Sequence, residues 1–121
     1  PNINAALGCA QLENLDRYVA DKRETAACYA EFFKGKEDIT FFTEPADCKS
    51  NYWLNAVVLK DKAAQLDFLE YTNDHGVMTR PVWELMNRLP MFEHCETDGL
   101  ENTEWLADRV VNIPSSVRLE N

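Results

Sequence analysis

The stretch that decides the fold is residues 2–34, which reads NINAALGCAQLENLDRYVADKRETAACYAEFFK. Apolar side chains recur along it at steps of three and four residues, a spacing that places them on one face of a helix. They are Leu12, Leu15, Val19, Ala26, Tyr29 and Phe33. Charged side chains fill the positions between them and form a solvated face. The pattern predicts one long helix over residues 2–34, with Gly35 as its C-terminal stop.

The first turns of this helix differ from the rest, because residues 5–10 are small or apolar on every side. A helix without a polar face has to be covered, so we expect another subunit or domain to pack against these turns. The chain begins with Pro1 rather than Met and has neither the basic nor the apolar region of a secretion signal. We therefore interpret it as a piece of a longer protein.

Beyond Gly35 the pattern changes to short apolar runs separated by turns. It predicts strands over residues 39–42, 52–59, 77–80 and 110–113, and helices over residues 62–74 and 102–108. Asp61 is expected to cap the first of these helices. The side chains expected to face inward are Ala63, Leu66, Phe68 and Leu69 of this helix, and Trp105 and Leu106 of the last helix. This order predicts an α+β layer in which helices pack on a small, mainly antiparallel sheet, with the first two strands antiparallel to each other.

Composition narrows the class of protein. The 121 residues are 45% hydrophobic, which is typical of a globular domain. A formal net charge of −9 argues against nucleic acid as a partner, because binding to phosphates requires basic residues. No apolar run approaches the roughly 20 residues that span a bilayer, so we expect no membrane partner.

Four cysteines, Cys9, Cys28, Cys48 and Cys95, lack metal-ligand spacing and are not dense enough for a disulfide scaffold. We expect free thiols, buried or half-buried, in a reducing compartment, and so a cytoplasmic protein. The two histidines, His75 and His94, are interpreted as structural, and no metal site is predicted.

One segment, residues 79–83, has a composition suited to binding. Arg80 lies between a predicted strand and a proline and close to Trp83, so a cationic fork stands beside a flat ring. That combination suits a phosphate or a planar ring system. A salt-bridged surface arginine next to a core tryptophan is the alternative, and the sequence leaves both open.

The chain resembles the DegT/DnrJ/EryC1/StrS sugar aminotransferases. The residues that carry the resemblance in the first helix are Asn4, Ala5, Ala6, Gly8, Gln11, Leu12, Lys22, Arg23 and Tyr29. NYWLNAVVL (51–59), GVMTRPVWELMNRLPMF (76–92) and RVVNIPSS (109–116) resemble later segments of the family in the same order. The RPVW and NIPSS forms are most similar to the branch acting on nucleotide-linked amino sugars of the legionaminic-acid or bacillosamine type.

The resemblance implies a specific enzyme. Members are homodimers of fold type I that use pyridoxal phosphate (PLP) to move an amino group, usually from glutamate, onto a nucleotide-linked keto sugar for cell-surface polysaccharide or glycan synthesis. The Schiff-base lysine and the cofactor site lie in a large domain, and none of the six lysines here matches the family's lysine motif. The chain would then be the small C-terminal domain, with residues 1–35 as a linking helix and residues 36–121 as the domain proper. It would hold no catalytic residue and no PLP of its own, and would be inactive alone.

The resemblance also assigns substrate-binding residues to this chain. Arg80 would contact the nucleotide phosphates or the sugar, and Trp83 would form a wall of the pocket. Asn87 stands where many relatives carry histidine; it cannot titrate near neutral pH but can bond to a sugar hydroxyl. Two alternatives remain, a free-standing acidic protein-interaction module and a nucleotide-sugar-binding module that uses Arg80 and Trp83.

Overall fold

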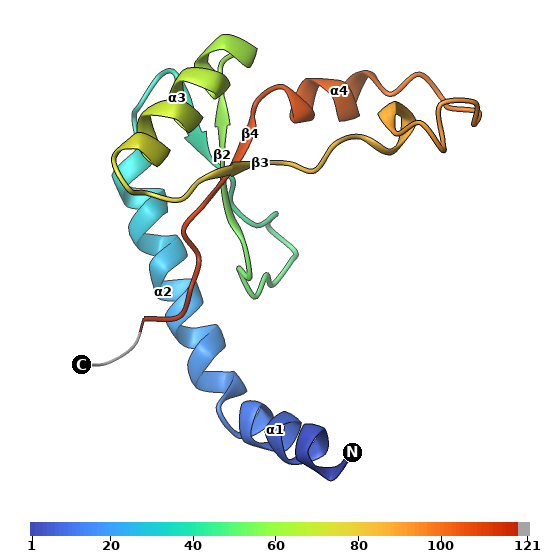
Figure 1. Ribbon diagram of the computed structural model, residues 1–121. Coiled ribbons are helices and arrows are strands. Elements are labelled where there is room, and N and C mark those ends of the chain that lie inside the picture. The colour runs from blue at the N-terminus through green and yellow to red at the C-terminus, as the bar shows by residue number, and fades with distance from the viewer. Residues whose placement is uncertain (119–121) are drawn as a thin grey trace.

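The computed structural model describes residues 1–118 and contains a small antiparallel sheet covered by helices on one face (Figure 1). The helices are α1 (Asn2–Glu13), α2 (Leu15–Phe33), α3 (Lys62–Asp74), α4 (Glu101–Ala107) and the 3₁₀ helix η1 (Met86–Arg88). The strands are β1 (Ile39–Phe41), β2 (Asn55–Leu59), β3 (Arg80–Pro81) and β4 (Val110–Ile113), in the order β1-β2-β4-β3. The predicted α+β class is confirmed.

The core lies between the sheet and two helices. In β2 the side chains alternate, so that Asn55, Val57 and Leu59 are buried on one face. Val57 stands opposite Val111 of β4, and Leu59 stands opposite Ile39 of β1. Side chains of α2 and α3 pack on this face, whereas the opposite face carries exposed or half-buried residues such as Val58.

The single long helix predicted over residues 2–34 is interrupted, so that prediction is wrong at one point. Asn14 separates α1 from α2, with φ −103° and ψ 0°. Its side-chain Nδ2 donates to the carbonyl of Ala10 (2.9 Å), and such local bonds compete with the helical backbone pattern. The predicted C-terminal stop is confirmed, because α2 ends at Phe33 and Gly35 has φ +75°.

Burial along these two helices is uneven. Ala26 is buried, and Tyr29 and Phe33 pack against the core as predicted. Leu12 and Leu15 are exposed instead, at 69% and 48%, because no element within residues 1–118 lies over them. The expectation that another subunit or domain covers the first turns stays a prediction.

Three strands are shorter than predicted, and the first of them, β1, ends one residue early at Phe41. Residues 52–54 are not part of β2, because Tyr52 has a left-handed backbone (φ +46°) and belongs to the preceding loop. Residues 77–79 are not part of β3, since the amide of Val77 bonds back to the carbonyl of Thr72 at the end of α3. The predicted bounds of α3 and β4 are confirmed, as is the Asp61 cap, whose Oδ1 accepts from the amide of Ala64 (2.8 Å).

Several expected core positions are wrong. Trp105 and Leu106 are 50% and 40% exposed, and Ala63 and Leu66 are exposed too. The buried residue of α3 is Gln65, whose Nε2 donates to the carbonyls of Ala107 (2.9 Å) and Val110 (2.8 Å). These bonds tie α3 to the end of α4 and the start of β4, and allow a polar side chain to be fully buried.

The four cysteines are free, as predicted, but all are exposed rather than buried. They lie in helices and loops outside the core cluster. The apolar residues next to them in the sequence therefore do not bury them. No helix within residues 1–118 combines the length and apolarity that crossing a membrane requires.

Two parts of the chain project from this body (Figure 1). One is α1, which extends from the N-terminal end of α2 away from the sheet. The other is the segment through η1 and α4, drawn in orange and red, which leaves β3 and returns to β4.

Candidate functional site

Arg80 and Trp83 line the same hollow, which has a volume of about 610 Å³. Other walls come from Lys22 of α2, from Trp53 and Leu54 before β2, and from residues 112–116 at the end of β4. The size falls within the range of small-molecule sites. Two cations and two indole rings thus border one space, built from segments that are far apart in the sequence.

Arg80 is available for a ligand. It lies on the edge strand β3 opposite Asn112, on the sheet face that α2 and α3 do not cover. Its Nη2 lies 3.4 Å from the Sδ of Met78, and no carboxylate among residues 1–118 pairs with it. An unpaired guanidinium can offer its planar fork of donors to a phosphate or carboxylate.

Trp83 is 91% exposed. The alternative interpretation of this segment, a salt-bridged arginine beside a core tryptophan, is therefore wrong on both counts. A large apolar ring left in solvent on the rim of a hollow indicates a surface that another molecule covers.

Asn87 is not brought to this hollow. It lies in η1 and lines a separate depression of about 260 Å³ with Met86, Phe92 and Cys95. The structure therefore joins two of the three predicted substrate-binding residues and places the third on the projecting segment.

Lys22 holds the wall of the hollow together. Its Nζ donates to the carbonyl of Ser115 and reaches the carbonyl of Trp53 at 3.5 Å. The Oγ of Ser115 accepts from the amide of Asn55 (2.7 Å) and donates to the carbonyl of Ile113 (2.7 Å). α2, the start of β2 and the end of β4 are thereby connected at one point.

The segment after β4 is bound along α2. The hydroxyl of Tyr29 donates to the carbonyl of Pro114 (3.1 Å), and burial raises the pKa of that hydroxyl. Arg118 bonds to Asp21 through its amide (2.9 Å) and its Nε (2.8 Å), and to Glu24 through Nη2 (2.6 Å). The Arg118 amide, followed by its side chain, holds the pKa of Asp21 below its ordinary value.

Sequence reasoning missed Lys22, Trp53 and Ser115 as residues of this hollow. Lys22 and Ser115 stand in motifs that carry the resemblance, and Trp53 stands in the NYWL segment, so the signal was present. What the sequence lacks is the pairing of these motifs, which only the packing of α2 against the ends of β2 and β4 provides.

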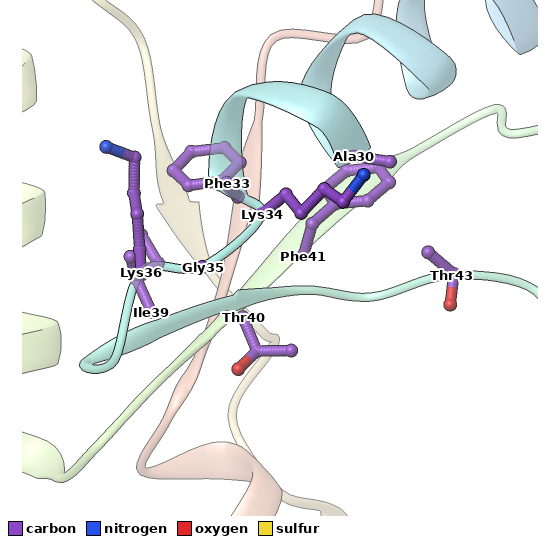
Figure 2. Close-up of a pocket in the computed structure, with 9 residues that line it drawn as sticks. All are labelled: Ala30, Phe33, Lys34, Gly35, Lys36, Ile39, Thr40, Phe41 and Thr43. Atoms are coloured by element: carbon purple, nitrogen blue, oxygen red, sulfur yellow. The ribbon is translucent and has the colours of Figure 1, made fainter.

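A further hollow, of about 230 Å³, lies where α2 ends beside the edge strand β1 (Figure 2). Its apolar lining consists of Ala30, Phe33, Ile39 and Phe41, which also belong to the core or pack against it. Figure 2 shows Lys34 and Lys36 at its rim, and Lys34 pairs with Glu31 at 3.4 Å. We interpret it as an open margin of the core.

The lysine side chains of this chain are either bound to backbone oxygens or open to solvent. Lys22 is bound to carbonyl oxygens, and the other lysines, at positions 34, 36, 49, 60 and 62, are exposed. Residues 1–118 contain no group of three or more histidine, cysteine, aspartate or glutamate side chains arranged to hold a metal. His75 bonds through Nδ1 to the carbonyl of Tyr71 (2.7 Å) at the end of α3, which is a structural role.

Solved structures define the class of protein. The chain superposes on the sugar aminotransferase CalS13 from Micromonospora echinospora with a TM-score of 0.82 and 25% identity, covering 96% of this chain and 30% of that one. It superposes on Helicobacter pylori PseC, an aminotransferase involved in the biosynthesis of pseudoaminic acid, with a TM-score of 0.87 and 19% identity. That match covers 98% of this chain and 33% of PseC. The fold is one found within aminotransferases.

Sequence comparison then defines the family. The profile of the DegT/DnrJ/EryC1/StrS aminotransferase family matches residues 1–121, and the chain belongs to this family. The GDP-perosamine synthase of Escherichia coli O157:H7 is 28% identical over 122 residues, covering 99% of this chain and 32% of that protein. The chain spans about a third of the length of the curated relatives it matches.

Proposed function

We propose that this chain works as the C-terminal small domain of a PLP-dependent aminotransferase that transfers an amino group, from glutamate, to a nucleotide-linked keto sugar. The observation that carries the proposal is the family match over the whole chain. Relatives named for a GDP-linked sugar and for sugar amination support the substrate class. The product would serve cell-surface polysaccharide or glycan synthesis.

In this proposal the chain supplies part of the substrate site. Arg80 binds the phosphates of the nucleotide, since its guanidinium is exposed and has no acidic partner within residues 1–118. Trp83 covers a ring of the substrate from the rim of the same hollow. Asn87 contacts a sugar hydroxyl from the projecting segment, at a second position along the ligand.

PLP acts as an electron sink in amino-group transfer. Because the lysines of this chain are bound to carbonyls or exposed, we propose that the Schiff-base lysine belongs to residues outside this sequence and that these residues alone are inactive. Residues 1–35 then link the two domains, residues 36–121 form the small domain, and the enzyme is a homodimer. Four free cysteines support a reducing compartment, the cytoplasm.

Steady-state kinetics of the native-length gene product test the substrate role. Arg80→Ala should raise KM for the nucleotide sugar about tenfold or more, because a charge-assisted contact to phosphate is lost. The matched control is Arg109→Ala, since Arg109 bonds to the carbonyls of Lys60 and Trp105 away from the hollow. An unchanged KM in Arg80→Ala would reject this role.

A second candidate is a free-standing nucleotide-sugar-binding module. It is favoured by one observation, that both cations and both indoles of the hollow come from this chain. It predicts that the 121 residues alone bind a nucleotide sugar and lose it on Arg80→Ala; absence of binding by these residues would reject it.

A further inference from the structure

The loop of residues 44–54 is held to α2 by a network of polar contacts. Arg23 makes a bidentate pair with Glu44, Nη2 to Oε1 at 2.6 Å and Nη1 to Oε2 at 3.0 Å. Nη1 of Arg23 also donates to the carbonyl of Ser50, and the amide of Ser50 donates back to Oε2 of Glu44. We call these three residues the clasp.

The clasp has the geometry of a stable charge pair. Both side chains are only partly exposed, 33% for Arg23 and 22% for Glu44. The guanidinium of Arg23, followed by the Ser50 amide, lowers the pKa of Glu44 to about 2. The pair is therefore ionised throughout the neutral range.

Tyr52 connects the clasp to the residues that follow it in the chain. It has φ +46°, a conformation that a bulky side chain adopts only when its surroundings enforce it. Its hydroxyl accepts from the amide of Glu44 (3.1 Å), its amide donates to Oγ of Ser50 (3.0 Å), and the Arg23 guanidinium lies 5.6 Å from its ring centre. The clasp thus fixes the direction in which the chain leaves Tyr52.

The residues that follow are the ones that line the hollow. Trp53 is 65% exposed and Leu54 is 45% exposed, although the chain on both sides of them is bound. Asn55, directly after them, is 1% exposed and its amide is bound to Ser115. A large aromatic side chain that is left uncovered on a tightly held corner, beside Lys22 and Arg80, is suited to contact with a ligand.

We infer that Trp53 is a further wall of the nucleotide-binding hollow, against which a ring of the ligand packs, and that Arg23 and Glu44 are positioning residues that hold Trp53 in place. This inference rests on the proposed function and adds to it a residue and a device that the family resemblance does not assign. Arg23 and Glu44 do not touch the ligand; they act through Tyr52 on the Trp53 corner.

The test is a double-mutant cycle on the affinity of the native-length gene product for GDP, dTDP and UDP, each measured separately by calorimetry. Trp53→Ala should weaken binding of the preferred nucleotide about fivefold or more, the effect expected from the loss of ring packing. Arg23→Lys, which keeps the charge but loses the fork, should weaken it to a similar extent. Arg17→Lys, an exposed arginine on the same helix, is the matched control and should leave affinity unchanged.

Coupling decides between positioning and a merely structural role. If Arg23 acts through Trp53, Arg23→Lys should change affinity by less than about twofold when Trp53 is already alanine. Additive effects, or no effect of Trp53→Ala, would overturn the inference. Glu44→Gln replaces Arg23→Lys in the cycle if that variant does not fold.

The outcomes separate the inference from the proposed function. Binding that Arg80→Ala weakens and Trp53→Ala does not would leave the proposed function standing and remove the inference. No binding of any of the three nucleotides to the unmodified protein would count against both.

Discussion

α1 and the end of α2 are both rich in small and apolar residues, but their surroundings are opposite. In α1 these residues stand on every side of the helix and none is buried, whereas in α2 they form one face, and Ala26, Tyr29 and Phe33 join the core. The difference lies in what each helix faces. The sheet lies beneath the second half of α2, and within residues 1–118 nothing lies over α1.

An apolar stretch of helix indicates that another surface covers it, but the sequence does not tell where that surface comes from. The relatives are about three times as long as this chain. In such proteins, residues outside the matched third are available to cover a helix like α1. Substitutions at four positions of the 121-residue chain test the contrast between the packed region around the sheet and the exposed helix α1.

The largest effect is expected in the core beneath α2. Phe41→Ala should lower the free energy of unfolding by about 3 kcal/mol, because Phe41 is buried against the rings of Tyr29 and Phe33. Urea unfolding measures it. The neighbouring Phe42→Ala is the control, because Phe42 is 57% exposed and should cost far less. An equal loss of unfolding free energy in the two variants would contradict this account, because it would mean that the core does not lie beneath α2.

The next effect concerns the buried polar residue of α3. Gln65→Leu should lower the free energy of unfolding by about 2 kcal/mol, because the carbonyls of Ala107 and Val110 lose their donor. The same change in α1, Gln11→Leu, should have little effect, because Gln11 is exposed. If Gln65→Leu stabilised the protein, the two carbonyls would have to find other partners.

The middle of α2 is held by charge, so its contribution depends on pH. The folded-state pKa of Glu44 is about 2, below the value of 4.5 expected in the unfolded chain. Its stabilising contribution is therefore full above about pH 4.5 and is lost as the pH falls toward 2. Glu44→Gln should flatten the stability profile in that window, measured by thermal unfolding from pH 2 to 7. Glu31→Gln, in an exposed ion pair, should keep the original profile, and a Glu44→Gln profile as steep as the original would contradict the clasp.

The smallest effect is expected in α1. Leu7→Ser should change the free energy of unfolding of the 121 residues by less than about 0.5 kcal/mol, because Leu7 is 63% exposed and touches no core residue. The same substitution in the native-length gene product should cost more, if a further domain or subunit covers α1. A large loss in the 121 residues would show that α1 is packed within them.

Local features of the sequence were sufficient for part of the fold. The Asp61 cap, the length of α3 and the strand at residues 110–113 depend on neighbouring residues, and all three were predicted correctly. The break at Asn14 and the burial of Gln65 were missed, because both depend on hydrogen bonds that apolar periodicity does not report. Trp105 was expected inside, but it is half exposed and the guanidinium of Arg109, rather than the core, lies over its ring at 4.6 Å.

The candidate site was predictable to a similar degree. Arg80 and Trp83 were singled out because they lie three residues apart in the sequence, and they line one hollow, although their role in binding stays a prediction. Asn87 was assigned to the same site because of the family resemblance, whereas in the structure it lies in η1 and lines another depression, so its contact with a ligand stays a prediction. Trp53 and Lys22 were missed as site residues because tertiary packing, and not sequence distance, brings them beside Arg80.

The most direct test of the proposed function is an intact-mass measurement, under denaturing conditions, of the native gene product that carries these residues, with an assay for released PLP. A polypeptide of about three times 13.9 kDa that releases one PLP per chain is the predicted result. A polypeptide of 13.9 kDa, or a longer one that releases no PLP, would contradict the proposal that this chain is the small domain of a PLP-dependent aminotransferase.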